Sequence, residues 1–427
     1  MSTRALEVWC FDALAGVLED GTDGLTFAYA PDWVEAGWPP LSQSLPLDGS
    51  FTAATATAFF SGLLPEGAPR DVLARQLGVS AGNDFSLLAA LAGDTAGAIT
   101  LLPPDERPSA SDAQGDVTWL DDVELAAEID RLPLRPMHVD EDGEYRLSLA
   151  GAQDKLPVVV GMDGRIGLTT GRTPSTHIMK TPIPGLQDSV ANEAMCLDLG
   201  RRLRIPVVAA VPRRAGDREY LLVARYDRED DGSAGTRRLH QEDFCQALGI
   251  PTQRKYQAEG GPALPDCFAL LRRASTVPAR DSVHMLDYVT LSFLVGNHDA
   301  HAKNYSLLYR PEHIELAPAY DILSTFVYRG ALRLSRKMAM SIGVEYRPDY
   351  VRGRHLTEML AASGLGPTAA RRRINTLAVA APEHAQAARD ALAAAGWDAP
   401  VLGKIVDMVN QRSGWLQAAG RTQSGRT

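Results

Sequence analysis

The chain has 427 residues, more than one hydrophobic core usually accommodates, and 45% of them are apolar, as in an ordinary soluble globular protein. Its formal net charge of -10 argues against autonomous tight binding of nucleic acid over the whole surface, because phosphate neutralisation requires clustered Lys and Arg. Its four cysteines have no zinc or redox spacing, and no apolar run reaches the roughly 20 residues that span a bilayer. We therefore expect a folded, cytoplasmic protein with more than one domain that does not bind a membrane.

Residues 1–105 predict a small α+β subdomain of their own. Short apolar runs predict strands, and the sequence Glu-Asp-Gly at 19–21 predicts a turn. The expected strands cover 6–9, 24–29 and 98–102, and the expected helices cover 53–64 and 71–77. A stretch rich in Pro, Ser and Asp follows at 103–115 and predicts a linker.

The next part, 106–238, is rich in predicted strands. Turn signals at 161–164 and 215–217 each lie between two short apolar runs and predict hairpins. The expected strands cover 156–160, 165–168, 176–180, 205–212 and 220–225, and an amphipathic helix capped by Ser189 covers 189–203. Strands, one helix and further strands follow the order of a protein kinase's small lobe.

From 239 to 427 the pattern becomes mostly helical, with the clearest expected helices at 241–248, 263–273 and 282–295. The whole chain therefore predicts an α+β protein-kinase-like two-lobed fold, with a mixed β-sheet N-lobe and an all-helical C-lobe, and with the N-terminal subdomain added. Residues 351–427 carry ten Lys or Arg against five Asp or Glu, including Arg371 to Arg373. A solvated helix face explains this charge most simply, and phosphate contacts with DNA are the alternative.

The segment Asn-His-Asp-Ala-His-Ala-Lys-Asn at 297–304 carries the strongest chemical signal. Asp299 precedes Asn304 by five residues, and a further carboxylate follows at Asp321. Protein kinases use such a set to orient the acceptor hydroxyl and to hold Mg²⁺ on ATP. Asp299 would accept the proton of the hydroxyl, Asn304 and Asp321 would supply the oxygen ligands that Mg²⁺ prefers, and Lys303 could pair with the transferring phosphate.

The same segment also allows a different chemistry. His298, Asp299 and His301 place two imidazoles and a carboxylate within four residues, and such groups can ligate Zn²⁺ or Mn²⁺. When this segment is considered alone, a metal-dependent hydrolase therefore explains it nearly as well as a kinase does. A third interpretation is a protein that acts only by docking on a partner and catalyses nothing.

Residues further upstream favour the kinase. Lys180 ends an apolar strand, where a kinase places the lysine that pairs with the ATP phosphates, and Glu193 on the next helix can hold its ammonium group. The residues at 148–155 (Ser-Leu-Ala-Gly-Ala-Gln-Asp-Lys) are mostly small and suit a turn that covers phosphates with backbone N–H groups.

These motifs occur in the order seen in HipA-type serine/threonine kinases, the toxin halves of bacterial type II toxin-antitoxin pairs, and the resemblance covers nearly the whole chain. From residue 148 onward it is carried by the segments at 148–155, 176–180, 192–193, 225–228, 241–246, 255–256, 260–262, 296–304, 320–322 and 337–340. Segments at 27–31, 41–47 and 60–65 resemble the N-terminal subdomain of that family.

The resemblance implies a role for each matched residue. Asp299 would be the catalytic acid-base residue with Lys303 beside it, Asn304 and Asp321 would hold Mg²⁺, and Ser148 would be an autophosphorylation site that switches the kinase off. A phosphate there would repel the phosphates of ATP. The implied ATP-binding residues include Lys180 and His301. Two further groups are implied: the phosphates would be covered by Leu149, Ala150, Gly151, Ala152, Gln153, Asp154 and Lys155, and adenine would be surrounded by Ala224, Tyr226 and Gln241. Glu193 would support Lys180.

The resemblance also implies partners. They are a HipB-like helix-turn-helix antitoxin dimer, operator DNA bound mainly through that antitoxin, and a protein substrate such as an aminoacyl-tRNA synthetase, with glutamyl-tRNA synthetase as one example. The acidic charge of the chain agrees with leaving most DNA contacts to the antitoxin.

Overall fold

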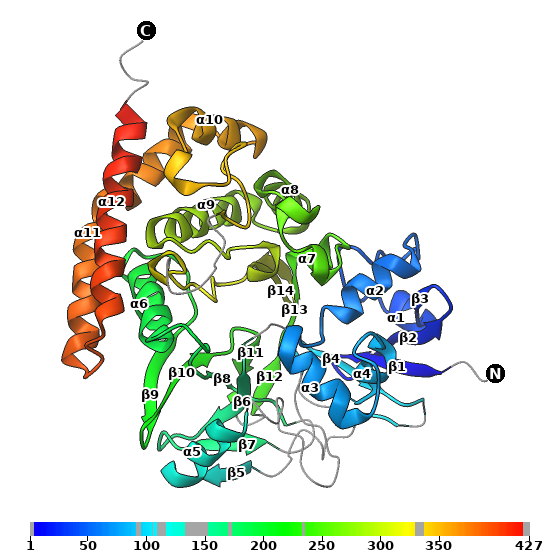
Figure 1. Cartoon of the computed structure of the whole chain (residues 1–427). Helices are drawn as coiled ribbons and strands as arrows, with labels where there is room; N and C mark the ends of the chain where they lie inside the picture. The colour runs from blue at the N-terminus through cyan, green and yellow to red at the C-terminus, as the bar shows by residue number, and fades with distance from the viewer. Residues whose placement is uncertain are drawn as a thin grey trace. The chain divides into compact units, whose positions relative to one another are not determined.

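The structure is a computed structural model that describes residues 4–90, 95–104, 106–108, 117–132, 153–169, 173–232, 235–328 and 337–421. The chain forms two compact units (Figure 1). Unit 1 comprises Met1–Thr181, Arg213–Gln253 and Leu308–Pro311, and unit 2 comprises Pro182–Pro212, Arg254–Leu307 and Glu312–Thr427.

The N-terminal part of unit 1 is an antiparallel sheet covered by helices. The sheet has the order β3-β2-β1-β4 and consists of β1 (Ala5–Cys10), β2 (Ala13–Gly21), β3 (Gly24–Tyr29) and β4 (Ile99–Leu102). The helices are α1 (Pro31–Glu35), α2 (Ala53–Ser61), α3 (Gly67–Leu77) and α4 (Asp84–Ala90). Trp33, Phe59 and Phe60 are buried in the core between them. This confirms the helices and strands expected before residue 103.

The turn expected at 19–21 is wrong, because these residues form the end of β2 and the turn lies between Gly21 and Gly24. Both charged residues are exposed at this end of the strand, and Asp20 pairs with Arg4 at 2.5 Å. Exposed charges at a strand end are tolerated, so Glu-Asp-Gly did not mark the turn itself.

A second sheet in unit 1 has the order β5-β7-β6-β8-β10-β9. Its strands are β5 (Val117–Leu120), β6 (Lys155–Val160), β7 (Ile166–Thr169), β8 (His177–Lys180), β9 (Ala210–Ala215) and β10 (Arg218–Ala224). Helix α5 (Asp122–Arg131) buries Leu125 and Ile129 against this sheet. β5 and α5 were not predicted from the sequence, although Asp121 and Glu124 form a capping box at the start of α5.

Unit 1 also contains the ribbon of β11 (Arg228–Asp230) and β12 (Thr236–Arg238), followed by β13 (His240–Asp243) and the short helix α7 (Phe244–Ala247). The helix expected at 241–248 is therefore wrong over its first residues. Asp243 is the N-cap of α7, and its side chain accepts a hydrogen bond from the backbone of Gln246. A capping residue lies outside the helix that it caps, so the strand extends to Asp243.

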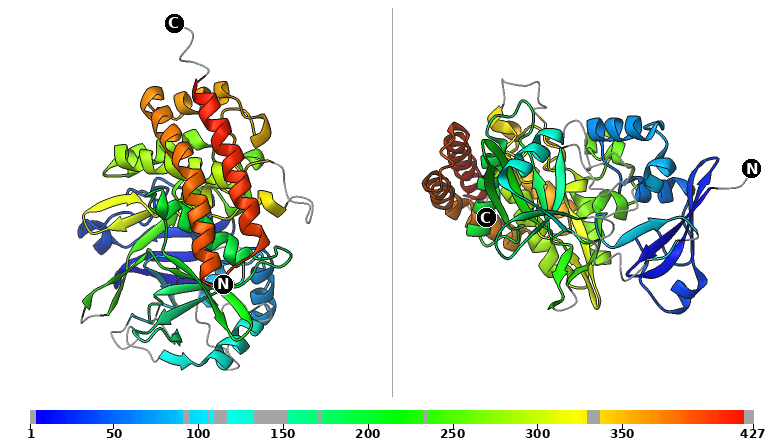
Figure 2. Two further views of the ribbon diagram at one scale, coloured as in Figure 1. Left: turned by 90° about the vertical axis from the view of Figure 1, so that its left-hand side faces the viewer. Right: turned by 90° about the horizontal axis from the view of Figure 1, so that it is seen from below.

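Unit 2 is mainly helical. It contains α6 (Ser189–Arg202), α8 (Leu264–Ala274), α9 (Pro278–Val295), α10 (Gly353–Ala362), α11 (Pro367–Ala394) and α12 (Pro400–Arg421). The long helices α11 and α12, orange and red in Figure 2, pack side by side. Short 3₁₀ turns lie at η3 (Thr252–Arg254), η4 (Gln257–Glu259), η5 (Ala302–Asn304), η6 (Phe326–Tyr328) and η7 (Pro348–Tyr350).

Three features of this part of the chain differ from the expectation. Residues 239–427 are not all helical, because β14 (Ser306–Arg310) and β15 (His313–Leu316) form from short runs of apolar and β-favouring residues around Pro311. Ser189 does not cap α6, whose N-cap is Asp188; the Ser189 hydroxyl instead accepts a hydrogen bond from the Ile183 backbone at 2.8 Å. The strand expected at 205–212 begins only at Ala210.

Within the described residues no helix is both long enough and apolar enough to cross a membrane.

Candidate functional site

In unit 2 the segment that carries Asp299 starts at a glycine-terminated helix. Helix α9 ends at Gly296, whose φ of 73° is in the left-handed region, and a Cβ there would lie 2.8 Å from Cβ of Phe326. The backbone of Asn297 then donates to the carbonyl of Ser292 at 2.8 Å. A glycine is thus required at this position for the chain to leave the helix and enter 297–304.

Asp299 is exposed, and its backbone is fixed by its neighbours. Its N–H donates to Oδ1 of Asn297 at 3.0 Å, and its carbonyl accepts from the backbone of His301 at 2.8 Å. The side chain accepts a hydrogen bond from the hydroxyl of Tyr256, with Oδ1 2.8 Å from the tyrosine oxygen. An exposed carboxylate on a hydrogen-bonded loop can accept a proton from an incoming hydroxyl group.

The chain segments that carry Asn304 and Asp321 are joined directly. The hydroxyl of Tyr320 donates to the carbonyl of Lys303 at 2.8 Å and shares a hydrogen bond of 2.7 Å with Ser306. The side chain of the residue before Asp321 is thus bound to the backbone of the residue before Asn304. Both predicted Mg²⁺ ligands therefore lie on segments that one tyrosine connects.

The side chain of Asn304 has the property expected of a metal ligand. Its Oδ1 atom is buried and has no hydrogen-bond partner among the residues that the structure describes. A buried amide oxygen without a partner costs free energy unless something else binds it. Asp321 adds a half-buried carboxylate in the left-handed conformation, with φ of 54°, which a non-glycine residue adopts only at a cost. These oxygen donors fit Mg²⁺.

The two histidines of the segment do not support the metal-dependent hydrolase. The His298 ring packs edge-on against Phe326 at 5.5 Å, whereas the His301 ring packs against Tyr256 at 5.3 Å. Burial lowers the pKa of His301 to about 3, assisted by the positive charges of Lys255 and Lys303. Among the described residues no group of three His, Cys, Asp or Glu side chains is placed to hold a metal ion.

Helix α6 holds the segment that follows Asp321. Asn192, fully buried on α6, accepts from the Ser324 backbone N–H at 2.8 Å and donates to the Ser324 carbonyl at 3.0 Å. Its amide also donates to the Tyr328 hydroxyl at 3.1 Å. Glu193, the next residue, is buried as well. The position of 321–328 in unit 2 is therefore set from α6.

In unit 1 the predicted phosphate-binding residues form a second group. Lys180 is only 6% exposed and lies directly opposite Lys155 in the antiparallel pair of β6 and β8, so both side chains project from the same face. The Gln153 amide donates to the Thr181 carbonyl at 2.7 Å, and the Thr181 N–H donates to the Asp154 carbonyl at 3.4 Å. Burial raises the pKa of Asp154. Two facing lysines suit a polyphosphate ligand.

Most of the expected phosphate loop lies outside the described residues. The residues concerned are Ser148, Leu149, Ala150, Gly151 and Ala152.

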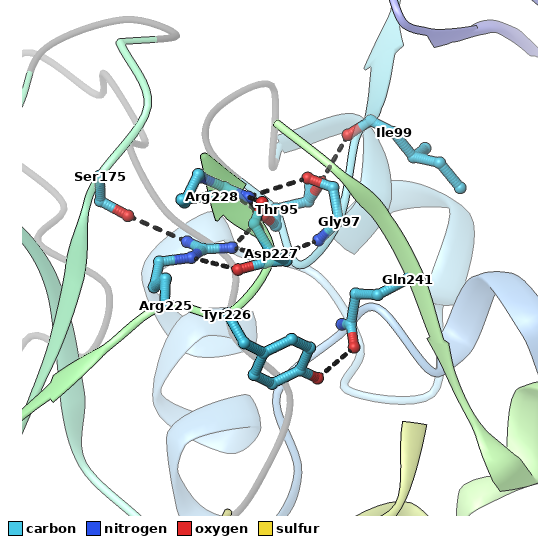
Figure 3. A network of polar contacts seen from close by, with 9 residues as sticks. All are labelled: Thr95, Gly97, Ile99, Ser175, Arg225, Tyr226, Asp227, Arg228 and Gln241. Atoms are coloured by element: carbon cyan, nitrogen blue, oxygen red, sulfur yellow. Dashed lines mark hydrogen bonds and ion pairs between the residues drawn. The ribbon is translucent and has the colours of Figure 1, made fainter. Parts of the chain in front are cut away.

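The predicted adenine-binding residues form a third group, also in unit 1. The hydroxyl of Tyr226 donates to Oε1 of Gln241 at 2.5 Å (Figure 3). Ala224 ends β10 opposite His177 of β8. The structure thus brings Tyr226 and Gln241 together and places Ala224 on the strand that leads to them.

A buried ion cluster beside these residues was not recognised in the sequence. Arg225 binds both carboxylate oxygens of Asp227, at 2.9 and 2.7 Å, and Arg228 approaches the same carboxylate at 3.0 Å (Figure 3). The Gly97 N–H donates to Asp227 at 2.7 Å, and the Thr95 carbonyl accepts from Arg225 at 2.9 Å. The cluster ties the turn before β4 to the chain around Tyr226. In the sequence, only the short spacing of Arg225, Asp227 and Arg228 indicated this cluster.

Arg371 to Arg373 are only partly available for a further ligand. Arg373 binds Asp287 through two hydrogen bonds of 2.7 and 2.6 Å, and Arg371 donates to the Thr357 hydroxyl at 2.5 Å. Arg372 is exposed.

Two family models match the chain. One is described as a HipA-like C-terminal domain and matches residues 147–385, and the other as a HipA N-terminal domain and matches residues 6–102.

Similar proteins extend over most of the chain. A putative kinase, Y4mE, of Sinorhizobium fredii is 42% identical over 88% of this chain and 90% of its own length. The serine/threonine-protein kinase toxin HipA of Shewanella oneidensis is 32% identical over 85% of this chain and 84% of its own length. A solved structure of the Shewanella oneidensis HipA, HipB and operator DNA complex superimposes with a TM-score of 0.80 at 28% identity and covers 98% of this chain and 97% of that chain.

Proposed function

The chain belongs to the HipA family of serine/threonine kinase toxins, and on that premise we propose that it is an ATP-dependent serine/threonine protein kinase. The observation that carries the proposal is the buried Oδ1 of Asn304, which has no hydrogen-bond partner among the described residues. It lies five residues after an exposed carboxylate, on a segment joined through Tyr320 to the one that carries Asp321. This arrangement supplies a proton acceptor and oxygen ligands for a hard cation.

Each residue has a specific role in this proposal. Asp299 orients the acceptor hydroxyl and accepts its proton, while Lys303 offers positive charge to the transferring phosphoryl group. Lys155 and Lys180 contact the ATP phosphates together with the segment from Leu149 to Asp154. Glu193 is the carboxylate that we propose to support Lys180.

Adenine is bound in this proposal by the backbone from Ala224 to Tyr226, with Gln241 beside it, and His301 contributes to the nucleotide site. Burial keeps His301 neutral, with a pKa of about 3, so it adds no positive charge near the phosphates.

Asn304 and Asp321 would hold Mg²⁺. The ion would neutralise charge on the phosphate oxygens of ATP.

We further propose that the chain has the two-lobed organisation of protein kinases. The N-terminal subdomain would extend to about residue 105 and the N-lobe to about residue 238, followed by the C-lobe. The order of the elements supports this, since the sheet of β5 to β10 precedes most of the helices of unit 2.

The biological setting that we propose is a toxin-antitoxin module. The toxin would pair with a HipB-like helix-turn-helix antitoxin dimer, and operator DNA would be bound mainly through that antitoxin. The similarity to the HipA in the Shewanella oneidensis complex supports this, and the net charge of -10 agrees with it. Such a toxin acts inside the cytoplasm. Its substrate would be an aminoacyl-tRNA synthetase, such as glutamyl-tRNA synthetase, whose phosphorylation would inhibit translation and growth.

Ser148 is the proposed autophosphorylation site. A phosphate at this residue would add nearly two negative charges directly before the segment assigned to the ATP phosphates, and would therefore oppose nucleotide binding. Autophosphorylation would in this way inactivate the kinase.

Mass spectrometry after incubation with Mg-ATP tests the proposal. The chain is first treated with phosphatase, and wild type is compared with Asp299→Asn, Ser148→Ala and the control Asp398→Asn, which alters an exposed carboxylate in unit 2. We expect one phosphate on Ser148 in wild type and in Asp398→Asn, and none in the other two variants. Phosphate on Asp299→Asn, or on no form of the chain, would overturn the kinase assignment.

A further inference from the structure

Tyr256 contacts two residues of the catalytic segment, although the resemblance of the segment at 255–256 assigned it no role. Its hydroxyl donates to Oδ1 of Asp299 at 2.8 Å across 43 residues of sequence. Its ring meets the His301 ring in an edge-to-face arrangement, with centroids 5.3 Å apart. Both contacts lie within unit 2.

The loop around Tyr256 is tightly wound. The Tyr256 carbonyl accepts hydrogen bonds from the N–H groups of Glu259 at 2.9 Å and of Gly261 at 3.0 Å. A Cβ at Gly261 would lie 2.1 Å from the carbonyl oxygen of Arg254 and 2.8 Å from that of Tyr256. Because no side chain fits there, the close approach of these backbone segments requires a glycine.

This loop is also tied to the catalytic segment through a third piece of chain. The Gln257 N–H donates to the Ala339 carbonyl at 3.1 Å, and the Ala339 N–H donates to the His298 carbonyl at 2.8 Å. The Gln257 side chain accepts from the Ser341 N–H at 2.8 Å. Backbone hydrogen bonds therefore connect Tyr256 to the residue before Asp299 independently of the tyrosine hydroxyl.

These hydrogen bonds hold the backbone that carries Tyr256 in place relative to Asp299. A catalytic group works efficiently only when it is held in the productive geometry, and the hydrogen bond from Tyr256 restrains the Asp299 carboxylate.

We propose that Tyr256 is a positioning residue, whose hydroxyl holds the carboxylate of Asp299 in the orientation needed to accept the proton of the acceptor hydroxyl. This inference rests on the proposed kinase function. It does not make Tyr256 a catalytic residue, since its hydroxyl acts on the reaction only through Asp299.

The test is Tyr256→Phe, which removes the hydroxyl and keeps the ring that packs on His301. Tyr350→Phe is the matched control, because Tyr350 is an exposed tyrosine in the same unit and is 54% accessible. For each protein we would measure the maximum rate of phosphate transfer from Mg-ATP to the chain itself, the ATP concentration at half-maximal rate, the dissociation constant of a non-hydrolysable ATP analogue, and the melting temperature.

We expect the maximum rate of Tyr256→Phe to fall about tenfold, as for the loss of a hydrogen bond to a charged group. Half-saturating ATP, analogue affinity and melting temperature should stay at the wild-type values, and Tyr350→Phe should match wild type in everything. A maximum rate of Tyr256→Phe equal to that of wild type would overturn the proposal. A loss of rate accompanied by equal losses of nucleotide affinity and stability would also overturn it, because such a result indicates a merely structural role. An inactive wild type would instead refute the proposed function, and the inference would fail with it.

Discussion

The side-chain amide of Asn192 pairs with the backbone of Ser324 in the way that one strand pairs with another. It accepts from the Ser324 N–H at 2.8 Å and donates to the Ser324 carbonyl at 3.0 Å. Both residues are fully buried. Because Ser324 follows Asp321 by three residues, this contact fixes the segment that carries a proposed Mg²⁺ ligand.

Replacing Asn192 with alanine should therefore affect both stability and the use of Mg²⁺. The buried backbone groups of Ser324 would lose their partners, so we expect the free energy of unfolding to fall by about 2–4 kcal/mol. The Mg²⁺ concentration at half-maximal activity should rise. Urea unfolding and a Mg²⁺ titration of the phosphorylation rate measure these effects. Asn375→Ala, at an exposed position of α11, should change neither, and the account of α6 fails if Asn192→Ala behaves like this control.

Asn304 provides a direct test of metal binding, because its buried Oδ1 has no protein partner among the described residues. Asn304→Ala removes this oxygen, and we expect the Mg²⁺ requirement to rise at least about tenfold. Asn304→Asp keeps an oxygen at the same position and should recover most of the affinity for Mg²⁺. Calorimetric titration of Mg²⁺ in the presence of a non-hydrolysable ATP analogue measures the difference. Equal Mg²⁺ affinity in wild type and Asn304→Ala would rule out this residue as a ligand.

Glu242 is a buried carboxyl group that should make stability depend on pH. Burial raises its pKa from 4.5 to about 7, although it accepts hydrogen bonds from Ser42 at 2.5 Å, from the Gln43 N–H at 3.0 Å and from Tyr309 at 2.5 Å. A folded-state pKa above the unfolded value stabilises the protein at low pH, and this contribution is lost as pH rises from about 4.5 through about 7. The loss is on the order of 3 kcal/mol.

Glu242→Gln should remove this loss, because glutamine does not titrate. Between pH 5 and pH 8 we therefore expect the unfolding free energy of wild type to fall relative to that of the variant. Chemical unfolding at both pH values measures it, with Glu383→Gln at an exposed position of α11 as the control. A difference that is the same at both pH values would show that Glu242 does not titrate in this range.

The ion cluster of Figure 3 predicts the opposite pH dependence. Burial alone would raise the pKa of Asp227, but the charges of Arg225 and Arg228 and the hydrogen bonds to the carboxylate outweigh it and lower the pKa to about 2. The contribution of Asp227 to the unfolding free energy is complete above pH 3.8, the pKa of this group in the unfolded chain. It is lost as pH falls toward the folded-state pKa of about 2.

Asp227→Asn should destabilise the folded chain by about 3–5 kcal/mol at neutral pH, because two buried arginines would lose their counter-charge. Thermal unfolding of wild type, Asp227→Asn and the exposed control Asp217→Asn measures the effect. A melting temperature of Asp227→Asn within error of wild type would show that the cluster contributes little to stability.

The sequence predicted the short-range features of the site better than the long-range ones. The spacing of Asp299 and Asn304 and the strand that ends at Lys180 are local patterns, and periodicity or a motif reveals them. Tyr256 and Asn192 act through partners 43 and 132 residues away. No local pattern encodes such contacts.

The errors in the fold have a similar origin. The residues of β13 were expected to be helical because their local pattern continues into α7, and only the capping role of Asp243 separates the two elements. β14 and β15 were missed because short strands within a helical region give a weak periodic signal. In both cases tertiary pairing decided between local alternatives of similar energy.

The role of Asp299 in a kinase reaction is tested most directly by transfer of the γ-phosphate from radiolabelled ATP to protein. Wild type, Asp299→Asn and Asp398→Asn would be compared at saturating Mg²⁺, after binding of a non-hydrolysable analogue has shown that all three bind nucleotide equally. We expect label in wild type and Asp398→Asn, and a labelling rate at least about 100-fold lower in Asp299→Asn. Labelling of Asp299→Asn at the wild-type rate would contradict the role of Asp299 as the proton acceptor.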